Sequence, residues 1–477
     1  MVVLSLKVRD IANFLEARVE NIPSEALSYS VTGVSVNSKK VRKGDLFVAL
    51  KGQKTDGHKY IKEAFFKGAV VSLCEENFTL EDDLLKSKKF PVIKVRSTLK
   101  ALQKIGYFIR KKFKGKVLGV TGSCGKTTTK DFIASVLGES YKVFKNKGNF
   151  NGQIGVPITL FSLDNTYNFS VIEMGISDFK EMEVLSNIVQ PDIAIITNIG
   201  HSHLEYLKSL ENVFKEKFKI TSNFSKDDVL FLNGNDPFLI RAKSFNLPFK
   251  VLTFGIDSPE LDFKAFNIKN TNEGIIFDVL YQDKVYKEFK IHAVGEHILK
   301  DALAAISVGL YFSIDENKIK SGLLKLIFGN GRQNIKKLEI LDKNNKKISV
   351  TIIDDSYNAN PESMKAAIDV LASTRQSKRK VAVLADMLEQ GENSKVLHEN
   401  IGKSLAESKV DILITLGNYS EFTSKVFKKI SKTAINYHFE KISEVYTKLI
   451  DIIKNGDVIL FKGSRSFHME NLVNRFL

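Results

Sequence analysis

A glycine-rich segment with a lysine and two hydroxyl residues has the composition of a phosphate-binding loop. It runs Thr121-Gly-Ser-Cys-Gly-Lys126-Thr127-Thr128, after an apolar run that predicts a strand and before a stretch that predicts a helix. Glycines let the backbone approach phosphate oxygens, and the first amides of the helix offer them partial positive charge. The alternative is a tight strand-to-helix turn on a lysine-rich surface. The register favours ATP binding, and the predicted contacts are Gly122, Ser123, Cys124, Gly125, Lys126, Thr127 and Thr128.

Within this loop, different residue types would bind different parts of a triphosphate and its metal ion. Lys126 would hold the β and γ oxygens, and the hydroxyl of Thr127 would bind Mg²⁺. Val120 stands where the general pattern of such loops has glycine, so the loop is a shorter variant.

Polar side chains also follow two further apolar runs in the same part of the chain. Glu173 ends the run 169–173, and His201 and His203 follow the run 192–198. Apolar runs that alternate with helical stretches predict a parallel sheet, in which ligands gather at the carboxyl ends of the strands. We therefore predict Glu173 and His203 as Mg²⁺ contacts, direct or through water. Each has a structural alternative, because a carboxylate can cap a helix and a single histidine is more often structural.

A lysine falls on the apolar face of a predicted helix over residues 213–224. A helical projection puts Lys217 in the middle of that face, and Lys215, Glu216 and Lys219 on the opposite side. An inward lysine needs an anionic partner or a changed charge state. Carbamylation by CO₂ would turn Lys217 into an anion able to bind a metal. The alternatives are an amine that reaches solvent along its alkyl stem, or a helix assigned to the wrong residues.

The composition limits the class of protein. The 477 residues are enough for roughly three domains, and 43% apolar with 26% charged residues predicts a folded chain. The net charge of +16 suits acidic partners such as nucleotides, but the lysines are scattered among Glu and Asp, which argues against a nucleic-acid groove. Only Cys74 and Cys124 occur, which excludes a disulfide framework. Without a signal peptide or a membrane-spanning segment, we expect a cytoplasmic protein.

The positions of hinges and apolar runs predict an α/β chain of three domains. A charged run at 111–116 precedes the strand of the phosphate loop, and Gly329-Asn-Gly331 is typical of a hinge. We predict a small mixed α/β domain over residues 1–111 and a P-loop ATPase-like domain with a parallel sheet over 112–329. Apolar runs that alternate with helical stretches predict a Rossmann-like domain over 330–477.

Together these residues resemble the Mur ligases of peptidoglycan synthesis, over essentially the whole chain. The matching segments, besides the phosphate loop, Glu173, His203 and Lys217, are 43–50, 56–58, 148–157, 354–361, 385–391, 462–465 and Arg332. The resemblance implies an ATP-dependent ligase that joins D-alanyl-D-alanine to UDP-N-acetylmuramoyl-tripeptide (UDP-MurNAc-tripeptide), giving the pentapeptide precursor of the cell wall. It implies that the tripeptide carboxylate takes the γ-phosphate, forming an acyl phosphate, which the dipeptide amine then attacks. The domains must close to keep water from that intermediate.

The resemblance also assigns roles to individual residues. Lys126, Lys217, Glu173 and His203 are implied to be catalytic, with Thr127, Glu173, His203 and carbamylated Lys217 around Mg²⁺. Nucleotide contacts are implied for Arg332, Asp355 and Asn358. Substrate contacts, to the UDP-sugar or to the dipeptide, are implied for Ser38, Asp45, Asp56, His58, Asn149, Asn151, Asn360, Lys462, Ser464 and Arg465.

The chain departs from the usual family pattern at a few positions. Ile298 and Asp301 stand where members usually carry two asparagines that contact the adenine side. Lys39, Gly152 and Lys219 replace a usual Arg, Asn and Glu. The alternatives to the implied function are a sibling ligase that adds a single amino acid, folylpolyglutamate synthase, a P-loop ATPase acting on nucleic acid, and a regulatory nucleotide-binding module. We expect a monomer without nucleic-acid partners.

Overall fold

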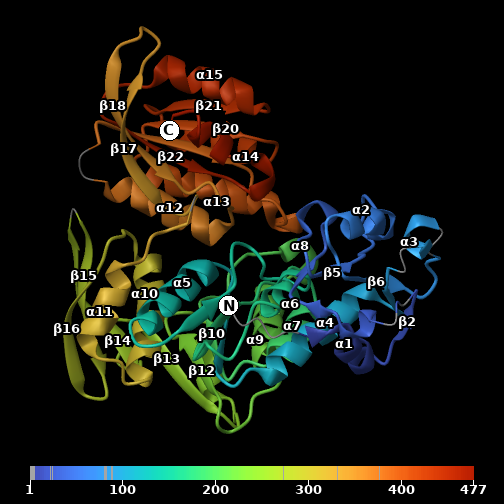
Figure 1. Cartoon of the computed structure of the whole chain (residues 1–477). Helices are drawn as coiled ribbons and strands as arrows, with labels where there is room; N and C mark the ends of the chain where they lie inside the picture. Colours follow the sequence, from blue (N-terminus) through green and yellow to red (C-terminus); the bar gives the residue numbers. More distant parts are fainter. Residues whose placement is uncertain are drawn as a thin grey trace.

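The computed structural model describes residues 6–21, 23, 25–79, 83–87, 90–271, 273–329, 331–374 and 377–476, with only the backbone of residues 84 and 85. Three sheets of five or more strands occur in this part of the chain, one after another in sequence. Figure 1 shows the N-terminal unit (blue) beside the central unit (cyan to yellow), with the C-terminal unit (orange to red) packed above the central one. We use these three names below.

The N-terminal unit is a mixed sheet in the order β2-β7-β6-β5-β4. β4 to β7 are parallel, and β2 pairs antiparallel with β7. Leu46 and Val48 face a core with α1 and α4, whereas Phe47 faces a core with α2, so helices cover both faces. The strands are β1 (Leu6–Lys7), β2 (Arg18–Glu20), β3 (Ser30–Val31), β4 (Gly33–Ser35), β5 (Asp45–Val48), β6 (Val71–Glu75) and β7 (Val92–Val95), and the helices are α1 (Val8–Leu15), α2 (Ile61–Phe66), α3 (Asp83–Ser87) and α4 (Thr98–Lys112).

The central unit is a sheet in the order β16-β15-β14-β13-β12-β11-β8-β10-β9. From β14 to β9 in this order, each pair of neighbouring strands is parallel. The pairs β14–β15 and β15–β16 are antiparallel. The strands are β8 (Lys116–Thr121), β9 (Val143–Lys145), β10 (Phe169–Glu173), β11 (Ile193–Ile196), β12 (Val229–Asn233), β13 (Lys250–Ile256), β14 (Phe263–Thr271), β15 (Gly274–Tyr281) and β16 (Lys284–Ile291). The helices are α5 (Lys126–Gly138), α6 (Gly155–Leu160), α7 (Glu181–Val189), α8 (Leu204–Leu207), α9 (Leu210–Phe218), α10 (Glu296–Tyr311) and α11 (Glu316–Leu324).

Helices cover both faces of the strand that leads into the phosphate loop. Val117 of β8 belongs to the core formed with α6, α7 and α9. Leu118 and Val120 belong to the core formed with α5, α10 and α11. Because successive side chains of a strand point to opposite faces, a strand buried on both faces must be apolar throughout. The continuous apolar run of β8 has this origin.

The C-terminal unit is a sheet in the order β17-β18-β22-β19-β20-β21, with β17 antiparallel to β18 and the other pairs parallel. The apolar runs of the sequence predicted β18, β19, β20 and β22, but neither β17 nor the parallel strand β21. The strands are β17 (Asn334–Leu341), β18 (Lys347–Asp354), β19 (Arg379–Ala385), β20 (Ile412–Leu416), β21 (Ile435–Phe439) and β22 (Asp457–Lys462), and the helices are α12 (Pro361–Ser373), α13 (Ser394–Glu407), α14 (Ser420–Ile430), α15 (Ile442–Ile452) and α16 (Glu470–Val473).

Each predicted boundary lies in the stretch of chain that joins two of the three sheets. The boundary at 111/112 falls in the last turn of α4, four residues before β8 begins. At the second boundary, Asn330 lies outside the described residues, and β17 begins at Asn334. None of the helices that the structure describes is long and apolar enough to cross a bilayer.

Candidate active site

The phosphate loop adopts a backbone that glycine makes possible. Gly125 has φ +77° directly before α5 begins at Lys126. A Cβ atom at Gly125 would lie 2.3 Å from Oδ1 of Asp301, so both the backbone conformation and the space require glycine. The Lys126 ammonium donates hydrogen bonds to the carbonyls of Gly122 (2.8 Å) and Ser123 (3.1 Å) and thus lies over the loop. Burial lowers the pKa of Lys126, and the Glu173 carboxylate opposes that shift.

The end of the neighbouring strand β11 holds the loop in this shape. The amides of Ser123 and Cys124 donate to Oδ1 of Asn198, at 3.1 and 2.9 Å. The Thr197 hydroxyl donates to the carbonyl of Cys124 at 2.5 Å. Because β11 lies directly beside β8 in the sheet, the predicted meeting of strand ends at one edge is confirmed.

A cavity of about 510 Å³ lies between this loop and the C-terminal unit. Residues from both units line it, so the cavity exists only where the two units meet. Its lining includes the predicted residues Ser123, Cys124, Gly125, Lys126, Thr127, Thr128, Asn149, Asn151, Glu173, His203, Arg332, Asp355, Asn358, Asn360, Lys462 and Arg465.

Glu173 and Thr127 meet at the floor of the cavity. The Thr127 hydroxyl donates to Oε2 of Glu173 at 2.7 Å, and the Asn151 amide donates to Oε1 at 2.7 Å. The buried Lys130 ammonium lies 3.7 Å from Oε2. In the part of the chain that the structure describes, no group of three or more His, Cys, Asp and Glu side chains could hold a metal. Mg²⁺ at a triphosphate commonly uses one or two protein oxygens besides phosphate and water, and the Thr127–Glu173 pair suits this type of site.

Lys217 points inward, as the helical projection predicts. It lies on α9 and its side chain is 1% exposed. Burial lowers the pKa of Lys217 well below its ordinary value, and the nearby Lys126 ammonium lowers it further. The lowered pKa favours the neutral form of the amine.

The prediction for the opposite face of this helix is wrong at one residue. Glu216 was expected on the solvent side, but it is 1% exposed. Its carboxylate accepts hydrogen bonds from the amide of Met182 at 3.3 Å and from Lys219 at 2.7 Å. Where Glu216 lies, the polar side of α9 is covered by α7, whose second residue is Met182. The helix also ends at Phe218 rather than at residue 224.

Two histidines after β11 contact the C-terminal unit. Nδ1 of His203 lies 2.5 Å from Oε2 of Glu389, and Nδ1 of His201 lies 2.5 Å from Oε1 of Glu362. Hydrogen bonding to Glu362 raises the pKa of His201, and hydrogen bonding to His203 lowers the pKa of Glu389. The sequence analysis assigned no role to either glutamate, because both belong to the C-terminal unit and lie more than 150 residues further along the chain than their histidine partners.

The C-terminal unit brings several predicted residues to the cavity. Lys462 is 2% exposed, and its ammonium contacts Oδ2 of Asp355 at 2.5 Å and the carbonyl of Asn358 at 3.0 Å. Asn360 caps α12, and its side-chain oxygen lies 3.1 Å from the Cys124 sulfur. The Arg332 guanidinium stacks 4.0 Å from the ring centre of Tyr357, a cavity residue that the sequence analysis missed.

The other predicted substrate residues lie outside this cavity. Ser464 does not line the cavity, and its hydroxyl oxygen accepts a hydrogen bond from the amide of Leu388 at 2.8 Å. In the N-terminal unit, Ser38 donates to Glu63 at 2.7 Å, and Asp56 contacts Nδ1 of His58 at 2.6 Å. Asp45 accepts from the amide of Arg42 at 2.8 Å, and burial raises the pKa of Asp45. Substrate contacts at Ser38, Asp45, Asp56, His58 and Ser464 stay predictions.

Asp301 lies beside the phosphate loop, where a negative charge would repel phosphate. Its Oδ1 accepts a hydrogen bond from the Thr129 hydroxyl at 2.9 Å, and the side chain lines the cavity. Burial raises the pKa of Asp301 to about 8, against the attraction of Arg332. At neutral pH the carboxyl is therefore protonated and uncharged, much as the asparagine of the usual family pattern would be.

Replacing Asp301 with Asn should change how stability depends on pH. The folded chain keeps this proton up to about pH 8, whereas the unfolded chain loses it near the ordinary pKa of 3.8. Between these values the folded state holds one extra proton, so rising pH lowers the free energy of unfolding by up to about 1.4 kcal/mol per pH unit. Asn cannot titrate. Urea unfolding should show the variant gaining on the wild type by a few kcal/mol (roughly 2–5) from pH 4 to pH 8. A difference that stays constant with pH would contradict a neutral Asp301.

Three family models match successive parts of the chain. The Mur ligase family catalytic domain matches residues 30–107, the Mur ligase middle domain matches 120–309, and the Mur ligase glutamate ligase domain matches 338–465. The UDP-N-acetylmuramoyl-tripeptide–D-alanyl-D-alanine ligase of Bacillus subtilis (strain 168) is 33% identical over 98% of this chain and 97% of its own length. The chain belongs to the Mur ligase family.

Solved structures resemble this Mur ligase over nearly its whole length. A crystal structure of MurF from Acinetobacter baumannii has a TM-score of 0.86 and 26% identity, covering 99% of this chain and 98% of that one. MurF ligase from Thermotoga maritima, solved in complex with ADP, has a TM-score of 0.78 and 28% identity, covering 95% and 98%. The three-unit α/β architecture is thus the architecture of this Mur ligase's structural relatives.

Proposed function

We propose that this Mur ligase joins D-alanyl-D-alanine to UDP-MurNAc-tripeptide while ATP is converted to ADP and phosphate. The relative from Bacillus subtilis is named for this reaction, and a MurF relative was solved with ADP. The observation that carries the proposal is the cavity itself, where the phosphate loop and the end of β22 face each other. An acyl phosphate formed at the loop is within the same enclosure as the groups of the C-terminal unit, which favours aminolysis over hydrolysis.

Within this reaction, the chain's own residues bind and position the reacting groups. Lys126 and the first amides of α5 offset charge on the phosphoryl group as it moves from ATP to the tripeptide carboxylate. Thr127, Glu173, His203 and carbamylated Lys217 would hold Mg²⁺, which supplies Lewis-acid stabilisation of phosphate oxygens. Arg332, Asp355 and Asn358 would contact the nucleotide.

The surroundings of Lys217 support its carbamylation. Burial lowers the pKa of the amine and so favours its neutral form, which is the form that attacks CO₂. The new N–C bond and the loss of one amine proton leave an anionic carbamate. The nearby Lys126 ammonium repels a second ammonium group at Lys217. The same charge would attract a carbamate anion at that position.

We also propose that residues 1–111, 112–329 and 330–477 act as separate domains. The first would bind the UDP-sugar, the second would bind ATP, and the third would contact the nucleotide and the incoming dipeptide. Asn149 and Asn151, together with Asn360, Lys462 and Arg465, would reach the reacting end of the peptide, since all five line the cavity. Ser38, Asp45, Asp56 and His58 of the first domain would bind the distant UDP-sugar end. We propose a cytoplasmic monomer.

The test of this function is phosphate release from ATP with purified UDP-MurNAc-tripeptide and a panel of amines. We expect release with D-alanyl-D-alanine and at most a few per cent of that rate with free D-alanine, L-glutamate or a diamino acid. Mass spectrometry should detect the UDP-MurNAc-pentapeptide. A preference for one free amino acid would identify a sibling ligase instead. Turnover of a folate substrate with glutamate would identify folylpolyglutamate synthase, whose solved structure shares only the fold at 14% identity.

A further inference from the structure

The contact between His203 and Glu389 joins two residues with unusual backbones. His203 has φ +55° and Glu389 has φ +63°, and neither is glycine. Such conformations are strained for residues that carry a side chain, and they persist where surrounding contacts enforce them. Nδ1 of His203 and Oε2 of Glu389 lie 2.5 Å apart, across the boundary between the central and C-terminal units.

The backbones around this pair are also in contact. The amide of Glu205, at the start of α8, donates to the carbonyl of Glu389 at 3.0 Å. Gly391 has φ +57°, and a Cβ atom there would lie 3.2 Å from Cα of Glu205. The segment 387–391 is therefore seated against α8 by main-chain contacts as well as by the side-chain pair.

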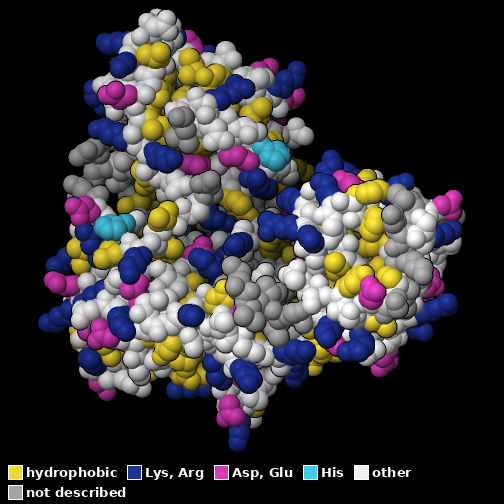
Figure 2. Space-filling model, in the orientation of Figure 1, with side chains coloured by type: hydrophobic (Ala, Val, Ile, Leu, Met, Phe, Trp, Pro, Cys, Tyr) yellow, Lys and Arg dark blue, Asp and Glu magenta, His cyan; other side chains and the backbone are white. Residues whose placement is uncertain are grey.

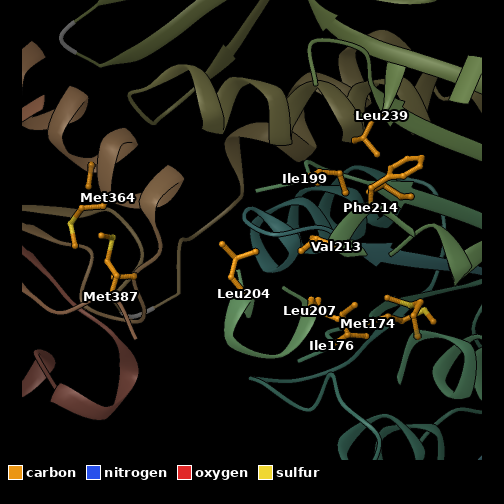
Figure 3. Packing of buried hydrophobic residues seen from close by; sticks show 14 of the residues in the cluster. Met174, Ile176, Ile199, Leu204, Leu207, Val213, Phe214, Leu239, Met364 and Met387 are labelled. Carbon is orange, nitrogen blue, oxygen red and sulfur yellow. The ribbon is translucent and has the colours of Figure 1, made fainter. Parts of the chain in front are cut away.

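Apolar residues surround the same contact. Leu204 is 4% exposed and Met387 is 1% exposed, and both belong to one core cluster that extends through the central and C-terminal units. In Figure 3, Leu204 is the labelled residue of the central unit that lies nearest to Met387 and Met364 of the C-terminal unit. Burial of these side chains stabilises the packed arrangement in which Glu389 reaches His203.

The geometry selects which nitrogen of His203 serves the cavity. A carboxylate accepts a hydrogen bond, so Glu389 places the ring proton on Nδ1 and leaves the lone pair on Nε2. His203 lines the cavity, whereas Glu389 does not. Carboxylates in this position commonly orient histidines that bind metals, directly or through water.

We propose that Glu389 is a positioning residue, which orients His203 toward the metal site only when the C-terminal unit packs on the central unit. Packing of the two units and completion of the metal site are then a single event. Mg²⁺ in turn stabilises the packed arrangement, because it binds that arrangement more tightly. This inference rests on the metal role of His203 in the proposed function.

The first measurement is metal binding, not turnover. Mn²⁺ binding to the ADP complex, followed by electron paramagnetic resonance, should weaken about 10- to 100-fold in Glu389→Ala. Glu389→Gln keeps a hydrogen-bond acceptor for Nδ1 and should stay within about threefold of the wild type. Glu392→Ala removes an exposed carboxylate directly after the segment 387–391 and serves as the matched control, with no change expected.

The second measurement asks whether Glu389 acts through His203. His203→Ala alone should weaken Mn²⁺ binding, and adding Glu389→Ala to it should change the affinity less than twofold. Small-angle scattering should show a larger radius of gyration for the Mn²⁺–ADP complex of Glu389→Ala than for that of Glu392→Ala. The inference would be overturned if the two substitutions weakened Mn²⁺ binding additively in the double variant. It would also be overturned if Glu389→Ala bound Mn²⁺ within twofold of the wild-type affinity. If His203→Ala itself binds Mn²⁺ normally, the metal role of His203 fails first, and the inference falls with it.

Discussion

Lys126→Ala is expected to lower the rate of phosphate release about a thousandfold. The ammonium lies over the loop and donates hydrogen bonds to the carbonyls of Gly122 and Ser123. A triphosphate would bind in this enclosed part of the site, beside the ammonium. Few water molecules could replace a fixed charge there, so the loss falls on the transition state. Steady-state assays with both peptide substrates would measure it.

The control for this substitution is Lys116→Ala, at the start of β8. Lys116 is 56% exposed and pairs with Asp192 at 3.4 Å on the surface, so its removal should change the rate less than twofold. Thermal unfolding of both variants separates loss of chemistry from loss of fold. A Lys126→Ala enzyme within tenfold of the wild-type rate would remove this lysine from the proposed mechanism.

Lys217→Ala should show the second large effect, a loss of about a thousandfold that small acids partly restore. The substitution removes a buried amine whose charged form is already disfavoured, so the fold should remain. It also leaves space on the inner face of α9, which formate or acetate can enter as a substitute for the carbamate anion. We expect rescue of at least about tenfold at millimolar acid, a gain of about 1.4 kcal/mol in transition-state stabilisation.

Lys215→Ala is the matched control for the rescue. Lys215 lies on the same helix and is 68% exposed. The activity of Lys215→Ala should equal that of the wild type, and added acid should not change it. Mass spectrometry of the intact wild-type protein under CO₂ should add the mass of one carbamate that Lys217→Ala lacks. Full activity of Lys217→Ala, or a folded but inactive variant that no acid rescues, would contradict the carbamate.

The inward position of Lys217 and the outward position of Glu216 were predicted by the same helical projection, and only one was right. The projection considers one helix by itself. It locates the apolar face correctly, because that face must be buried somewhere. It cannot tell that α7 covers part of the polar face as well, where Glu216 accepts a hydrogen bond from the amide of Met182.

The strands show the same distinction between local pattern and partner. β8, β10 and β11 were predicted because apolar runs buried on both faces stand out in sequence. β14 to β16 and β17 escaped, since their alternating pattern of polar and apolar residues is weaker, and a hairpin is defined by its pairing. Which strand each of them pairs with is known only from the tertiary structure.

The sequence by itself determined the phosphate loop, the three-part α/β organisation and the residues that gather at the edge of the central sheet. These follow from local backbone requirements and from periodicity, which neighbouring residues specify. Only the tertiary structure decided that Glu389 meets His203, that Asp301 is buried beside Gly125 and that the cavity needs the C-terminal unit. Contacts of this kind join residues far apart in the chain, and they depend on how whole units pack, which no local pattern encodes.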